Sequence, residues 1–168
     1  MLYNTELLNL YKNLIFMATT TDTASVLKDL VQINVDRYNG CQKAIEDVQD
    51  SDLKDMFSRM GQQSLNFKND LERFGSSDVH IPTDDTSTAS KVHRTWIDIK
   101  SVFTGKDRHS VLAAAEQGED TILKTYNHAL TNDSSAMSAE LRQLVQQQKQ
   151  ELLQSHNMVK ALRDAKMS

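Results

Sequence analysis

The chain has 168 residues, a formal net charge of -4, and only five Gly, one Pro and one Cys. This length suits one compact domain. Gly and Pro interrupt regular elements, so their scarcity favours long helices over a sheet of many strands. The negative charge argues against a general nucleic-acid-binding protein, and a single Cys excludes an internal disulfide.

Residues 1–22 precede the first clear amphipathic pattern. Their apolar stretch, 7–17, is shorter than the roughly 20 residues of a membrane-spanning helix and lacks the early Lys or Arg of a secretory signal. We expect an N-terminal extension over 1–22, poorly ordered or a misassigned start, and a folded domain over 23–168. The alternative is a peripheral anchor in which residues 2–17 contact a membrane surface.

Four long segments repeat apolar residues at the three- and four-residue steps of one helix face. They predict helices over 23–49, 51–74, 107–130 and 138–165. Short polar side chains suited to capping a helix start stand at Asp22 or Thr23, at Asp107 and at Ser138. The longest loop-like stretch, 75–88, is followed by a short helical pattern over 90–103.

The lengths of the connections predict the topology. Short links join the first helix to the second and the third to the fourth, so each pair forms an antiparallel hairpin. The 75–106 link is long enough to run the length of the bundle, which lets the second and third helices lie parallel. We therefore predict an all-α, ferritin-like four-helix bundle, with a long crossover between helices two and three that carries a short extra helix.

Polar residues fall in register with the apolar faces near the middle of every long helix. They are Asn34, Tyr38, Gln63, Ser64, Glu116, Glu119, Gln148 and His156. Buried carboxylates require partners, and we expect Tyr38, Gln148 and His156 to donate hydrogen bonds to the two Glu side chains. The favoured interpretation is a metal-free, hydrogen-bonded layer that fixes the register of the helices.

The alternative is an iron or manganese site formed by Glu116, Glu119 and His156. A ferritin-type dinuclear site takes a Glu from each of two helices and Glu-x-x-His from each of the other two. Four carboxylates are needed there to offset two divalent cations. This sequence contains no Glu-x-x-His, and its first two helices offer only uncharged residues at the corresponding places. We therefore expect no resident cofactor.

Two further features have a structural and a functional interpretation. Cys41 lies on the apolar face of the first helix, where we expect it to pack as a small core side chain. The 90–103 segment is basic and aromatic, with His93, Arg94 and Trp96. We expect Trp96 to cover one end of the bundle, and the alternative is that this segment binds an anionic partner.

Longer motifs extend the analysis to a family. They are NVDRYNG at 34–40, VHRTWIDIK at 92–100, TGKD at 104–107 and EQGED at 116–120, followed by Tyr126, Gln148, His156 and 162–164. With these motifs, the chain from about residue 23 to 165 resembles an uncharacterised bacterial family of ferritin-like four-helix bundles, a domain of unknown function.

This resemblance implies a cytoplasmic bacterial protein, and it brings no established activity, because a shared fold does not license a shared reaction. We expect a non-enzymatic accessory or stress-related protein that acts through self-association, as a homo-oligomer, or through a protein partner. The alternative is a metal-binding oxidoreductase with a degenerate site.

Overall fold

The computed structural model describes residues 3–75 and 107–165, and within 3–22 it describes the backbone and the side chain of Lys12. These ranges hold four α-helices, one 3₁₀ turn and no strand, so the predicted all-α class is confirmed. The elements are α1 (Tyr3–Asp47), α2 (Ser51–Glu72), α4 (Arg108–Thr131), η1 (Ser134–Ala136) and α5 (Ala139–Asp164). The short helix predicted over 90–103 lies outside the described residues.

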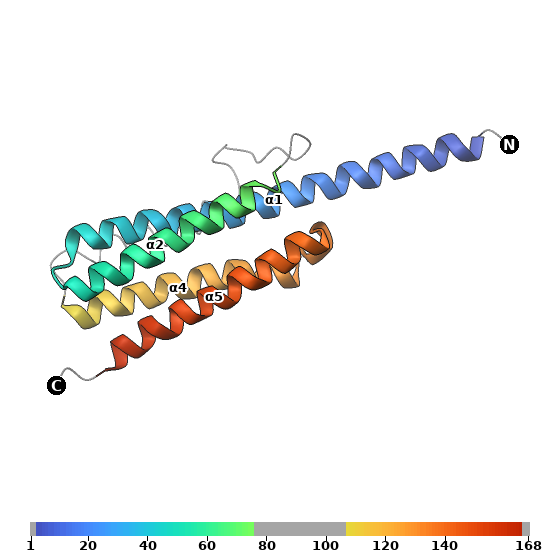
Figure 1. The fold of residues 1–168 in the computed structure, drawn as a ribbon. Coiled ribbons are helices and arrows are strands. Elements are labelled where there is room, and N and C mark those ends of the chain that lie inside the picture. Colours follow the sequence, from blue (N-terminus) through green and yellow to red (C-terminus); the bar gives the residue numbers. More distant parts are fainter. Residues whose placement is uncertain (1–2, 76–106, 166–168) are drawn as a thin grey trace.

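The four helices form two antiparallel hairpins, α1 with α2 and α4 with α5 (Figure 1). Arg108, the first residue of α4, pairs with Asp50 and Asp52 beside the start of α2, with a distance of 2.9 Å from Nη1 to Oδ2 of Asp50. The two helices therefore begin at the same end of the bundle and run parallel, as Figure 1 also shows. The end of α2 and the start of α4 therefore lie at opposite ends of the bundle.

The helix pairs also define the arrangement around the bundle axis. α1 packs mainly against α2 and α4, and α5 packs against the same two helices. α1 and α5 are therefore diagonal to each other, as are α2 and α4. Every pair of neighbouring helices in this ring is antiparallel.

α1 begins 20 residues earlier than the apolar pattern predicts. This helix of 45 residues is continuous from Tyr3 to Asp47, so Asp22 and Thr23 lie inside it and not at its start. The reason is the absence of breakers, since the first Gly is Gly40 and the single Pro is Pro82. The early part of α1 projects beyond the other helices (Figure 1). That 1–22 is an extension or a misassigned start stays a prediction, as does the membrane anchor.

The predicted apolar faces form one core. Side chains buried to 2% exposure or less come from every helix, among them Leu27, Phe57, Leu112, Ile122 and Leu152. Two predicted caps are confirmed: Asp107 Oδ1 accepts from the amide of Ser110 at 3.0 Å, and Ser138 Oγ accepts from that of Leu141 at 3.1 Å. In the described part of the chain, no helix is long and apolar enough to cross a membrane.

Candidate functional site

A buried ion pair joins α1 to α4 at the centre of the bundle. Arg37 of α1 donates from Nε to Oε1 of Glu119 at 2.6 Å and from Nη2 to Oε2 at 2.8 Å. Both side chains are 0% exposed. Two parallel hydrogen bonds of this kind are the strongest form of Arg–carboxylate contact, and they use both oxygens of the carboxylate.

The same guanidinium also binds α2. Its Nη1 lies 3.0 Å from the backbone oxygen of Met60, 3.0 Å from Oε1 of Gln63 and 2.9 Å from Oγ of Ser64. Gln63 Oε1 accepts a further hydrogen bond, at 3.1 Å, from Ser155 Oγ on α5. One arginine therefore ties its own helix to both neighbours of the ring, and Gln63 extends the connection to α5.

A second set of hydrogen bonds is centred on Tyr126 of α4. Its hydroxyl accepts from Nδ2 of Asn34 at 2.7 Å and donates to Oε1 of Gln148 at 2.8 Å. Nε2 of Gln148 then donates to the backbone oxygen of Phe67 at 3.3 Å. This set again contacts all four helices. With the Arg37 set it makes up what we call the central polar layer: Asn34, Arg37, Gln63, Ser64, Glu119, Tyr126 and Gln148.

Burial and the neighbouring charge shift the pKa of Arg37 in opposite directions. Burial disfavours the charged guanidinium, but the adjacent Glu119 carboxylate outweighs this effect and the pKa of Arg37 is raised. Burial also raises the pKa of the Tyr126 hydroxyl. The layer therefore contains one permanent cation, one carboxylate beside it and otherwise uncharged groups. Because Arg37 and Glu119 are fully buried, a substrate reaches neither unless the helices separate.

The sequence anticipated much of this layer but missed its cation. Asn34, Gln63, Ser64, Glu119 and Gln148 come together here. The half-buried Tyr38 lies instead beside Gly61 of α2 and takes no part in the layer's hydrogen bonds.

Arg37 is the residue of the layer that the sequence analysis did not select, although its position in the chain indicates burial. It stands seven residues after Leu30 and four before Cys41, on the same buried face of α1.

Glu116 and His156 lie outside the layer, in a partly exposed cluster between α4 and α5. Nε2 of His156 is 3.0 Å from Oδ1 of Asp120 and 3.9 Å from Oε1 of Glu116. Arg163 contacts the other oxygen of Glu116 and also pairs with Asp164 at 2.8 Å. Of the three predicted metal ligands, the structure brings Glu116 and His156 together and pairs Glu119 with Arg37.

The arrangement of the potential metal-binding side chains disfavours a metal site. Among the described residues, no group of three or more His, Cys, Asp or Glu side chains is arranged to hold a metal ion. A cation entering near Glu119 would have to displace a guanidinium that already uses both carboxylate oxygens. The iron or manganese site stays a prediction, and its accessible part is the pair formed by Glu116 and His156.

A cleft of about 500 Å³ opens where α4 begins and α5 ends. Its two arginines are Arg108 and Arg163, and each is already paired with acidic side chains. Leu112 and Leu162 add apolar surface to the lining. The cleft therefore offers little uncompensated charge to a ligand.

The single cysteine is a core residue. Cys41 is 1% exposed, and burial raises the pKa of its thiol to about 12. The thiolate is the nucleophilic form, so this side chain is unsuited to covalent chemistry at neutral pH. The predicted packing role of Cys41 is confirmed.

A protein-family match covers the part of the chain that contains the Arg37–Glu119 pair. Residues 22–132 match the family described as "Domain of unknown function (DUF2383)". This chain belongs to that family. The matched part contains both members of the Arg37–Glu119 pair, together with Asn34, Ser64 and Tyr126. A search of curated proteins gave no match.

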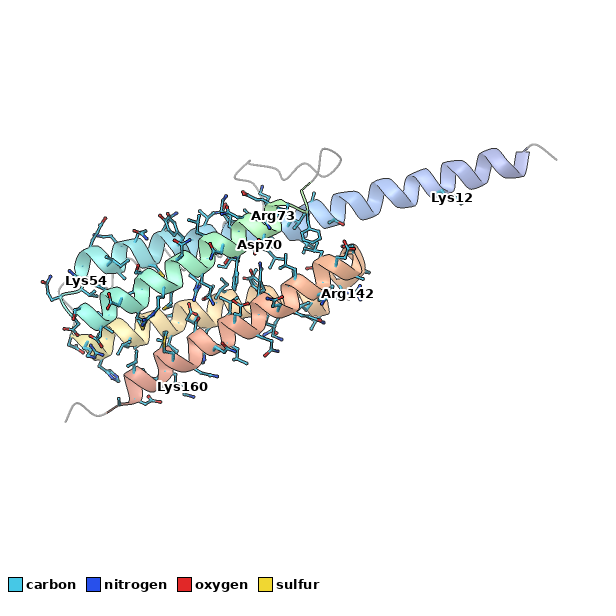
Figure 2. All side chains as sticks on the ribbon, in the orientation of Figure 1. Lys12, Lys54, Asp70, Arg73, Arg142 and Lys160 are labelled. Atoms are coloured by element: carbon cyan, nitrogen blue, oxygen red, sulfur yellow. The ribbon has the colours of Figure 1, made fainter. Side chains whose placement is uncertain are left out.

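Figure 2 shows how the side chains are distributed. Sticks from all four helices fill the centre of the bundle, whereas Lys12 stands on the projecting part of α1, far from the central polar layer. The candidate site of this family member is therefore a closed interior layer, with its surfaces left for contacts with other molecules.

Proposed function

We propose that this protein is a ferritin-like helical bundle without catalytic activity, which acts as an accessory protein through self-association or through a protein partner. A stress-related role, a bacterial source and a cytoplasmic location belong to the same proposal, on the strength of the resemblance. We infer the function class from the interior of the bundle, where the charged groups of the central polar layer are buried and paired with each other.

One observation carries the proposal: both oxygens of the only fully buried carboxylate in the central polar layer are bound by Arg37. In a ferritin-type site, buried carboxylates are compensated by metal ions. Here a guanidinium supplies the compensating positive charge. Glu119 is thereby neutralised by the protein itself, which removes the electrostatic demand for a metal at this position.

The topology supports the ferritin-like part of the proposal. The bundle consists of two antiparallel hairpins whose inner connection joins the diagonal, parallel helices α2 and α4. Bundles with a single long crossover of this kind include the ferritin-like folds, whereas a simple up-down-up-down bundle has only short connections.

The decisive experiment is elemental analysis of protein purified without chelators from cells supplied with iron and manganese. We expect substoichiometric amounts of both metals. The matched variants are Glu116→Gln and His156→Ala, which alter partly exposed side chains and leave the Arg37–Glu119 pair intact.

Stoichiometric metal that is lost in both variants, with unchanged circular dichroism, would replace this proposal with the alternative, a metal-binding oxidoreductase. Stoichiometric metal retained in both variants would also refute the proposal and would place the site elsewhere in the chain.

A further inference from the structure

The outward face of α5 carries a long run of exposed residues without charge. From 143 to 158, every exposed residue is uncharged, and most of them are amides. The charged residues of this stretch, Lys149 and Glu151, are only partly exposed and lie at its sides. With Ala161, we call this surface the amide face: Gln143, Gln146, Gln147, Gln150, Leu153, Gln154, Asn157, Met158 and Ala161.

Each of the other helices carries exposed charged residues, such as Glu46 on α1. The exposed residues of α2 include Asp52, Asp55 and Arg59, and those of α4 include Asp120 and Lys124. Along α5 itself, charged residues flank the stretch 143–158, with Arg142 before it and Lys160 after it, both labelled in Figure 2. α2 also presents a shorter row of exposed amides, Gln62, Asn66 and Asn69, so the surface of α5 is set apart by the larger number of its exposed amides.

The amide face also carries the exposed apolar side chains. In the described residues, the large hydrophobic side chains with high exposure are Leu153 at 40% and Met158 at 36%. They stand five positions apart in the chain, which places them about 140° apart around the helix axis at 100° per residue. Gln154 and Asn157 lie between them on this face. Two apolar edges thus border a central row of amides.

The central row has the spacing of a helix–helix contact. Gln143, Gln147, Gln150, Gln154 and Asn157, followed by Ala161, are separated by alternating steps of four and three residues. Alternating steps of four and three residues keep the same stripe of a helix against a partner helix along its whole length. At 1.5 Å per residue the stripe is about 27 Å long.

We propose that the amide face is a dimerisation surface, on which α5 of a second copy of this chain packs antiparallel across a twofold axis. This inference rests on the proposed function, because it names the partner in self-association. It places the contact on the amide face of α5 and names a second copy of this chain as the partner.

Self-complementarity favours a second copy as the occupant. A twofold interface places the same surface patch on both sides, so each group must suit its own kind. A Gln or Asn amide both donates and accepts hydrogen bonds, and therefore pairs with another amide, whereas a charged side chain repels its copy. Each chain has a net charge of -4, so two copies approach with least repulsion at a face that carries none.

The size of the face sets the expected strength. A stripe about 27 Å long on a helix about 10–12 Å wide covers roughly 300 Å² on each copy. Stable interfaces bury about 800 Å² on each partner, so we expect a weak dimer whose population depends on concentration. The amide face thus predicts reversible association and no obligate dimer.

The test is sedimentation equilibrium of the full chain over a wide concentration range. We compare the wild type with Gln150→Glu/Asn157→Glu, which places two carboxylates in the central row. The control is Gln62→Glu/Asn66→Glu, two exposed substitutions on α2 that change the net charge equally. Circular dichroism of each variant checks that the helices are intact.

We expect the mean mass of the wild type and of the control to rise with concentration from 19.0 kDa towards twice that value, and the face variant to stay monomeric. If the face variant associates like the wild type, the amide face is not the dimerisation surface, although the protein still self-associates. A wild type that stays monomeric throughout would overturn self-association as well. A control that loses association together with the face variant would refute the assignment to α5.

Discussion

Removal of one partner of the Arg37–Glu119 pair is the strongest perturbation that the structure suggests. Arg37→Met leaves a fully buried carboxylate without its donors, and Glu119→Leu leaves a fully buried guanidinium without its counter-charge. An uncompensated buried charge of this kind costs about 3–5 kcal/mol. At about 2–4 °C per kcal/mol for a domain of this size, each single variant should melt about 6–20 °C below the wild type.

The double variant Arg37→Met/Glu119→Leu separates the pair from its surroundings. It removes both charges and replaces them with apolar side chains, a change that is often neutral or even stabilising for buried pairs. We therefore expect the double variant to be more stable than either single variant. Urea denaturation followed by far-ultraviolet circular dichroism gives the free energies of unfolding of the wild type and the three variants, and the non-additivity of the changes gives the coupling energy.

A matched surface pair provides the control. Lys68 and Glu72 form a 2.8 Å ion pair one helical turn apart on α2, with side chains 28% and 42% exposed. The same cycle of substitutions to Ala should give a coupling of about 0.3–0.5 kcal/mol there. The reasoning is refuted if the single variants at Arg37 and Glu119 cost less than about 1 kcal/mol, or if their effects simply add.

Three further predictions concern individual residues. Burial, followed by the charge of Asp133, raises the pKa of Asp29, so the stability that protonated Asp29 provides is present at low pH and lost as the pH rises through this raised pKa. Asp29→Asn should therefore exceed the wild type in stability at neutral pH but not in acid, as urea midpoints across pH will show. The Cys41 thiol should resist a disulfide reagent in the native protein and react on unfolding in urea; immediate stoichiometric labelling would contradict this. A methyl group at Gly61 would lie 3.4 Å from Cβ of Cys41, an ordinary contact, so Gly61→Ala should raise the unfolding free energy by about 0.5–1 kcal/mol, whereas Gly61→Leu should lower it in the same denaturation assay.

The sequence predicted the helices well because their signal is local. Apolar residues at helical spacing identified the buried faces of all four long helices, and the short polar residues Asp107 and Ser138 identified two of their starts. The start of α1 was predicted 20 residues late, because a change in amphipathic pattern does not end a helix when no Gly or Pro breaks it.

The candidate site was harder to predict, because its chemistry depends on which helices meet. Helix periodicity placed Glu119 on a buried face, but only the packing of α1 against α4 shows that its partner is Arg37. An arginine in a polar-looking motif is normally solvated, since Arg is rarely buried without a partner. The partner lies 82 residues away in the chain, beyond the reach of any local pattern.

The central polar layer explains how the bundle selects one alignment of its helices. Apolar faces tolerate a shift of one helix past another, because hydrophobic contacts are not directional. A shift of α1 by one turn, about 5.4 Å, would separate Arg37 from Glu119 and leave two buried charges unpaired. It would also break the hydrogen bond from Asn34 to Tyr126. The layer therefore discriminates against misaligned bundles by several kcal/mol, and the coupling energy measured at Arg37 and Glu119 is also a measure of that discrimination.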